Sequence, residues 1–355
     1  MNVKLVSPLL KKAVYPCLSA AGFFRRGSES GLAVVTYHGV LPQGYERIDD
    51  AFDGNLVSAD ALHKQLRLLK ANYNVISPDD ALAWREGRFE LPPRAVLLTC
   101  DDGLLNNLTD MLPVLQQENL RCIFFVTGAS AGDQRTRLWY EDLFLVFRSA
   151  LAGKFEIESE AIVLRGQLGS RALRRASWWD AVKELSQVGA ETRLSFVRAA
   201  SSQLGVELSP IGGADDSSCR RFGLLTLSEL RALAAAGMTI GAHTMSHPLL
   251  SQLPLDLARG EIVDCRAKLE AALQTRVWAF AYPFGDAASV TPRVMAIPQE
   301  AGYTAAFLNF GGGLGANLPP YALPRIHVTS EMNLAELDAL VSGFHARLQR
   351  YAGRS

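Results

Sequence analysis

The sequence has few cysteines and no excess of charge of either sign, and both features exclude classes of function. Its 355 residues include five scattered cysteines with no CxxC pair, so neither a disulfide framework nor a cysteine zinc site is expected. Lysine plus arginine and aspartate plus glutamate each total 36. A chain without a basic excess is not expected to bind nucleic acid.

A long hydrophobic run is also missing. The segment "AVYPCLSAAGFF" lies between two basic pairs near the N-terminus and is too short to span a bilayer. Pro16 and the second basic pair fit a secretory signal poorly. We expect residues 1–30 to form an amphipathic segment that packs on the domain or contacts a membrane surface through residues 9–26. The expected location is the cytoplasm, including the face of the inner membrane, with secretion left open.

From Leu32 onward, short apolar segments alternate with amphipathic helical ones. Repeated βα units of this kind predict an α/β fold whose parallel strands close into a barrel. The alternation stops between Val126 and Leu227, where helical patterns and a polar run replace it. We therefore predict a barrel made of residues 31–130 and 226–350, with an inserted helical subdomain at 131–225.

The segment "LLTCDDG" ends an apolar strand with two adjacent carboxylates, Asp101 and Asp102. Residues that leave a strand in succession point different ways, so one carboxylate can bind a cation while the other accepts a proton. The alternative is an Asp-Asp-Gly turn in which an aspartate caps the next helix.

The segment "GAHTMSHPLL" follows another strand and carries His243 and His247, four positions apart. One helical turn would place both imidazoles on the same side, within reach of one metal ion. Two histidines and a carboxylate at strand ends suit a zinc hydrolase or an iron oxygenase. The second carboxylate favours hydrolysis, because hydrolysis needs a base and oxygen activation does not.

These motifs resemble those of the polysaccharide deacetylases that contain the NodB homology domain, carbohydrate esterase family 4. The family's Thr-Phe-Asp-Asp-Gly motif matches residues 99–103 except at Cys100, and its His-(Ser/Thr)-x-x-His motif matches residues 243–247. The segment "FAYPFG", residues 280–285, looks like the third motif. The resemblance covers about Leu32 to His327, and it implies a distorted barrel of the (β/α)7 type.

The resemblance also implies a reaction, in which a metal-dependent hydrolase removes N-acetyl groups from the amino sugars of a glycan or glycan precursor. A divalent metal, expected to be Zn²⁺, would be held by Asp102, His243 and His247. The resemblance implies that Asp101 is the base that takes a proton from water. His327 or His38 is the implied proton donor. Backbone N–H groups near Tyr282 or Phe284 are implied to bind the reacting carbonyl of the substrate.

One residue of the family pattern is missing. The arginine that in many members holds the catalytic aspartate is replaced by Ala281. Strand alternation in "YALPRIHV" puts Arg325 and His327 on one face, so we predict that Arg325 orients Asp101 instead. The alternative is that Arg325 pairs with an acidic residue on the barrel rim.

Two other functions and one further feature stay open at this stage. A non-catalytic glycan-binding barrel and a facial-triad iron oxygenase are the competing hypotheses. Trp178 and Trp179 are adjacent and either form a sugar-stacking platform or, as we expect, place one ring in a helix core and leave the other half-exposed.

Overall fold

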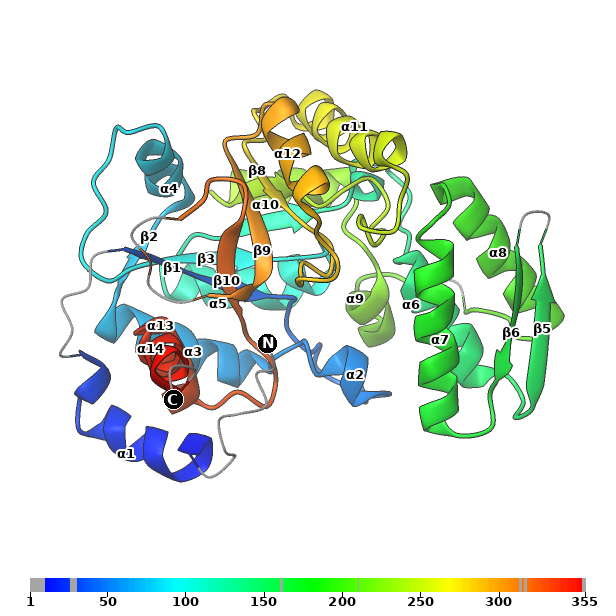
Figure 1. Ribbon diagram of the computed structural model, residues 1–355, viewed down its shortest axis with the longest axis horizontal. Helices are drawn as coiled ribbons and strands as arrows, with labels where there is room; N and C mark the ends of the chain where they lie inside the picture. The colour runs from blue at the N-terminus through cyan, green and yellow to red at the C-terminus, as the bar shows by residue number, and fades with distance from the viewer. Residues whose placement is uncertain are drawn as a thin grey trace.

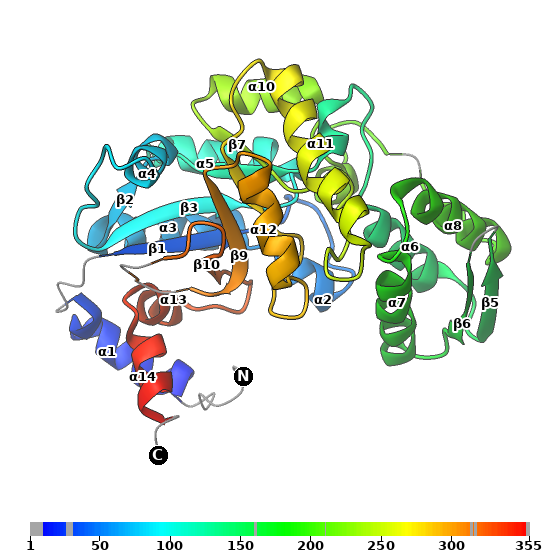
Figure 2. The ribbon, with the colours of Figure 1, turned by 45° about the horizontal axis from the view of Figure 1, so that its top comes forward.

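The protein was analysed as a computed structural model that describes residues 10–25, 31–159, 162–209, 211–312, 315 and 318–352. Its centre is a barrel of parallel strands surrounded by helices (Figures 1 and 2). The barrel closes because the first strand pairs with strands on both of its sides. Seven strands complete the ring: β1 (Leu32–Tyr37), β3 (Ala95–Cys100), β4 (Ile123–Val126), β7 (Thr239–Ala242), β8 (Ala279–Ala281), β9 (Ala305–Gly311) and β10 (Leu323–His327). The predicted (β/α)7-type barrel is confirmed.

An eighth parallel strand, β2 (Asn74–Ile76), lies outside the ring. It pairs with residues 95–97 of β3, whereas β4 pairs with residues 99–100 on the same edge. One edge of β3 is therefore shared between two short strands. This sharing explains why a sheet of eight strands closes into a barrel of only seven.

Several barrel strands are buried on both faces, which is why their sequences are mostly apolar. Every residue of β1 and β3 is buried. The outer face is covered by amphipathic helices such as α3 (Ala59–Asn72), whose Ser58 cap accepts a hydrogen bond from the Ala61 N–H and so satisfies a free helix donor. The other helices of this layer are α4 (Pro78–Arg85), α5 (Leu112–Gln117), α10 (Leu227–Ala235), α11 (Leu255–Leu273), α12 (Pro292–Glu300) and α13 (Leu334–Val341). The last helix, α14 (Phe344–Ala352), packs against α13.

The insertion between β4 and β7 is not wholly helical, and this corrects the sequence prediction. Besides α6 (Trp139–Ser149), α7 (Arg171–Leu185), α8 (Ala190–Gln203) and α9 (Ser217–Phe222), it contains an antiparallel hairpin of β5 (Lys154–Glu158) and β6 (Val163–Gln167). Only Phe155 and Ile157 of the hairpin strands are buried, so the apolar alternation was too short to be recognised. In Figure 1 most of the insertion, from α6 to α8, lies to one side of the barrel.

The N-terminal segment packs on the last helices of the chain, α13 and α14 (Figure 2). Tyr15 of α1 (Tyr15–Ala20) is fully buried, and its hydroxyl lies 3.0 Å from Nδ1 of His345. Of the predicted segment 1–30, residues 1–9 and 26–30 lie outside the described part of the chain, so the ends of the predicted membrane contact at 9–26 do too. None of the described helices is long and apolar enough to cross a membrane.

Candidate active site

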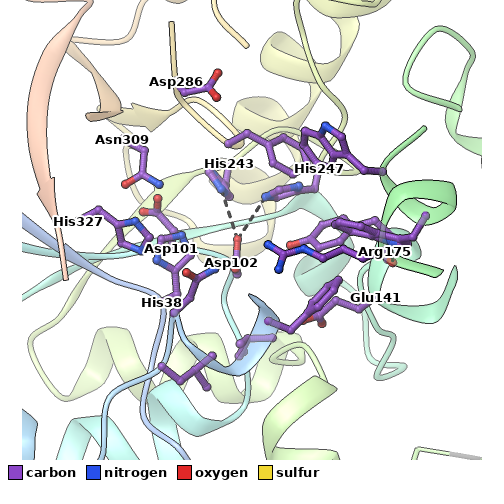
Figure 3. A pocket seen from close by; sticks show the side chains of 18 of the residues that line it. His38, Asp101, Asp102, Glu141, Arg175, His243, His247, Asp286, Asn309 and His327 are labelled. Atoms are coloured by element: carbon purple, nitrogen blue, oxygen red, sulfur yellow. Dashed lines mark hydrogen bonds and ion pairs between the residues drawn. The ribbon is translucent and has the colours of Figure 1, made fainter. Parts of the chain in front are cut away.

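The Asp-Asp-Gly turn separates its two carboxylates as the sequence predicts. Asp102 and Gly103 both adopt positive φ angles, 78° and 73°, which aspartate tolerates and glycine prefers. A Cβ at Gly103 would lie 2.9 Å from Cγ1 of Val126, so a larger residue would clash. The turn sends Asp102 toward two histidines and leaves Asp101 on the side of His327 (Figure 3).

Asp102, His243 and His247 form a buried group whose ligand atoms all lie within 4.8 Å of one another. Oδ1 of Asp102 is 3.5 Å from Nε2 of His243 and 3.2 Å from Nε2 of His247. Nδ1 of His243 donates to the Ala281 carbonyl at 2.7 Å, which fixes the tautomer and leaves Nε2 facing the site. A carboxylate and two imidazoles with room for further ligands fit a catalytic zinc ion.

The pKa shifts of Asp102 and His247 also suit a metal. Burial lowers the pKa of His247. Burial opposes ionisation of Asp102, but its contacts with His243 and His247 hold its pKa well below the usual range. Neutral imidazole and ionised carboxylate are the forms that bind metal.

The loop that carries the two histidines is not helical, which corrects the prediction of a helical turn. Thr244 and His247 have φ angles of 64° and 56°, and the His247 N–H donates to the Thr244 hydroxyl at 3.0 Å. Left-handed residues other than glycine cost free energy and often mark functional sites. The two imidazoles lie together, as their four-residue spacing predicts, but a strained left-handed turn and not a helical turn places them there.

The insertion holds this loop in place, and sequence reasoning missed the residues that do so. The Trp139 indole donates to the His247 carbonyl at 3.3 Å. Arg193, 1% exposed, donates to Glu261 at 3.0 Å, and the other Glu261 oxygen accepts the Ser246 N–H at 2.8 Å. Nothing local in the sequence marks these residues, because each contact joins distant segments.

Arg325 lies against Asp101, as strand alternation predicts. The guanidinium donates to Oδ1 at 2.7 Å and to Oδ2 at 2.5 Å, and its Nε donates to the Leu308 carbonyl at 2.7 Å. It is 1% exposed, so the alternative of an ion pair on the rim is wrong. Burial works to raise the pKa of Asp101, but the attraction and hydrogen bonds of Arg325, together with the attraction of His243 and His38, outweigh it and the pKa is lowered.

His38 and His327 stand together beside Asp101 (Figure 3), with ring centroids 4.6 Å apart. Nδ1 of His38 and Nε2 of His327 are buried without a hydrogen-bond partner in the described part of the chain. Burial, and then repulsion from His38, lower the pKa of His327 to about 3. His327 is therefore neutral at pH 7, and both rings keep polar atoms available to a ligand.

The low pKa of His327 predicts an acid-sensitive fold. Because unfolding restores the ordinary pKa of 6.5, the stability due to neutral His327 is complete above pH 6.5 and is lost as the pH falls toward 3. We expect the unfolding temperature of the metal-free protein to fall over this range, and to fall less steeply in His327→Gln. Thermal unfolding at a series of pH values measures both slopes, and equal slopes would contradict the prediction.

Only one of the two predicted substrate-binding residues reaches the site. Tyr282 is fully buried. Its backbone N–H donates to the Phe307 carbonyl at 3.1 Å, and its hydroxyl donates to the backbone carbonyl of Tyr321. Tyr282 therefore cannot stabilise an oxyanion, because the barrel ladder already uses its backbone donor. Phe284 does line the site, with its ring centroid 4.9 Å from that of His247.

These residues open into a cavity of about 800 Å³ formed between the barrel and the insertion. Trp178 is buried and donates its indole N–H to the Tyr140 carbonyl at 2.8 Å, whereas Trp179 is 37% exposed. The tryptophan pair thus divides as expected, but both rings line the cavity. Other wall residues from the insertion are Tyr140, Glu141, Ala172, Arg175, Ala176 and Arg221.

The family model described as polysaccharide deacetylase matches residues 89–193 and 211–306. The chain belongs to this family. As a member it is a deacetylase of glycans, a hydrolase with a barrel of the NodB type. Membership favours the hydrolase over the iron oxygenase and the non-catalytic barrel, and the 17-residue gap in the match lies within the insertion.

Solved structures with similar folds include the following three proteins, two of which are described as deacetylases. Streptococcus pyogenes deacetylase PplD is 17% identical over 88% of this chain and 98% of its own, with a TM-score of 0.55. IcaB from Ammonifex degensii is 18% identical over 88% and 97%, with a TM-score of 0.54. The de-N-acetylase from Aggregatibacter actinomycetemcomitans is 13% identical over 87% and 99%, with a TM-score of 0.51. A search of curated protein sequences found no match.

Proposed function

We propose that this deacetylase is metal-dependent and removes the acetyl group from an N-acetylated amino sugar of a glycan or glycan precursor. The observation that carries the proposal is the buried Asp102, His243 and His247 group beside a second carboxylate that Arg325 holds. Two of the similar structures support the reaction by description, one as a de-N-acetylase and one as a deacetylase in complex with acetate.

Asp102, His243 and His247 would hold the metal, which we propose is Zn²⁺. Such an ion lowers the pKa of water and polarises a carbonyl when it is bound. Asp101 accepts the proton of the attacking water. Its two oxygens each accept one bond from Arg325, which fixes the carboxylate and leaves further lone pairs for the water.

The leaving nitrogen needs a proton, and two imidazoles stand beside Asp101 to provide it. Two imidazolium rings whose centroids are 4.6 Å apart would repel each other. The pKa of His327 is lowered to about 3, so this ring is the neutral one of the two. We therefore propose His38 as the proton donor. We propose that neutral His327 hydrogen-bonds the substrate beside it.

Metal removal tests this proposal. We expect a chelator to abolish acetate release from an N-acetylglucosamine oligosaccharide, and Zn²⁺ or Co²⁺ to restore it, because the donor set suits both ions. Metal analysis should find about one ion per chain in the wild type and none in His247→Ala, since three protein ligands leave no redundancy.

A histidine outside the cavity provides the control. His63 lies on α3 beside Glu118, so His63→Ala should keep its metal. Full acetate release by demonstrably metal-free protein would refute metal dependence.

A further inference from the structure

Helix α7 of the insertion presents one stripe of side chains to the cavity. The four residues recur at helical spacing, so they share a face: Ala172, Arg175, Ala176 and Trp179. The residues that α7 buries lie on an adjacent stripe: Trp178, Ala181, Val182 and Leu185. Core packing therefore does not explain the first stripe, and its two alanines leave room between the helix and the barrel.

Arg175 differs from the other arginines of this region. Its side chain is exposed at the cavity and forms no hydrogen bond or ion pair with any residue that the structure describes. Its neighbour Arg171 pairs with Asp49 at 2.9 Å, and Arg174 donates to the Ala150 carbonyl at 2.9 Å.

The other arginine that lines the cavity is paired with carboxylates. Arg221 is held by Asp53 at 2.8 Å and by Glu141 at 2.9 Å. Arg175 thus brings to the wall a positive charge that is not paired with any carboxylate that the structure describes. Asp286 lies on the other side of the site (Figure 3).

An aromatic path leads from the metal-binding residues to this helix. The Phe284 ring lies 4.9 Å from His247 and 5.7 Å from Trp179, measured between centroids. Trp179 in turn lies 5.5 Å from Trp178, which supports it from behind. Exposed aromatic rings present large apolar surfaces that suit the apolar face of a sugar.

A buried acceptor completes the wall. Glu141 is 4% exposed and lines the cavity, and its Oε2 has no hydrogen-bond partner in the part of the chain that the structure describes. Its other oxygen is bound by Arg221, so the side chain is fixed. Leaving a buried acceptor unpaired is costly, and a ligand hydroxyl would satisfy it.

We propose that this wall is a subsite for an anionic group of the substrate. Arg175 pairs with the anion, Trp179 stacks on the sugar that carries it, and Glu141 accepts a bond from a sugar hydroxyl. The inference rests on the proposed deacetylation and narrows its substrate to anionic glycans. The shared chemistry is an oxyanion, either the carboxylate of a neighbouring sugar or the phosphate ester of a glycan precursor.

Calorimetric binding to protein supplied with Zn²⁺ tests the subsite with three probes. N,N′-diacetylchitobiose is neutral, the hyaluronan disaccharide carries a carboxylate, and N-acetylglucosamine 1-phosphate carries a phosphate. We expect at least one anionic probe to bind about tenfold more tightly than the neutral one, as a charge-assisted hydrogen bond allows. The preference should shrink as salt is added, and the preferred probe identifies the source of the anion.

Variants show whether the preference belongs to Arg175. In Arg175→Gln the affinity ratio of anionic to neutral probe should fall to near one, and Arg175→Lys should retain most of it. Arg198→Gln is the matched control, because Arg198 is an exposed arginine of α8 outside this cavity. Equal affinity for all probes, no measurable binding of any, or an unchanged ratio in Arg175→Gln would overturn the proposal.

Acetate release, measured on the same samples, separates this inference from the proposed function. Binding that depends on Arg175 without acetate release from any probe would count against the proposed reaction and support the subsite. Acetate release with no preference for an anion would support the proposed reaction and count against the subsite. Trp179→Leu should weaken the binding of all three probes, because the substitution removes the stacking surface. Unchanged affinities in Trp179→Leu would contradict the stacking role.

Discussion

Asp101→Asn is expected to lower kcat by about a hundredfold or more, which is the usual effect of losing a general base. Asparagine has nearly the same shape as aspartate but cannot take a proton from water. Because Asp102 and not Asp101 belongs to the proposed metal-binding group, the variant should still bind about one metal ion per chain. Steady-state acetate release and metal analysis of the same preparation measure both effects.

Substitution of the neighbouring carboxylate is the comparison that makes this result specific. Asp102→Ala should lose the metal as well as the activity. If Asp101→Asn emptied the site while Asp102→Ala kept its metal, the roles assigned to the two carboxylates would be reversed. A thermal unfolding scan shows whether either variant is merely misfolded.

Arg325→Met is expected to affect stability and pH dependence together. The residues Asp101 and Arg325 are 1% exposed each, and removing one partner of a buried pair typically costs about 3–5 kcal/mol because the other charge is left unpaired. Burial alone raises the pKa of Asp101. Without Arg325 the carboxylate is protonated at higher pH, so the acidic limb of the rate profile should move to higher pH.

Two further variants separate the positioning role of Arg325 from a purely structural one. Arg325→Lys keeps the charge but cannot form two parallel bonds, so it should recover part of the stability and less of kcat. The double variant Asp101→Asn/Arg325→Met should be more stable than Arg325→Met, because no charge is left unpaired. Urea unfolding and pH–rate profiles provide the measurements, and a pH profile unchanged in Arg325→Met would refute the role.

The barrel could be predicted from the sequence because its signals are local. Strands buried on both faces are continuously apolar, and the helices between them carry caps such as Ser58. The order of these units then determines a parallel sheet. The place of β2 outside the ring, in contrast, depends on how two short strands share one edge of β3.

Some residues of the candidate site could likewise be predicted from local sequence signals, and others could not. Asp101, Asp102, His243 and His247 were found because each lies in a short motif at the end of a strand. Arg325 was found from alternation along one strand, and its contact with Asp101 is present. Tyr282 was placed in the site because it belongs to a motif, yet its side chain points to Tyr321.

By itself the sequence determined the fold class, the Asp102, His243 and His247 group and the family, because strand ends and motif spacings are properties of neighbouring residues. Only the tertiary structure decided the left-handed turn at His247, the support of that turn by Arg193, and the wall that α7 contributes to the cavity. These features depend on contacts between residues dozens of positions apart. Their energies come from burial and charge pairing that exist only once the insertion has packed against the barrel.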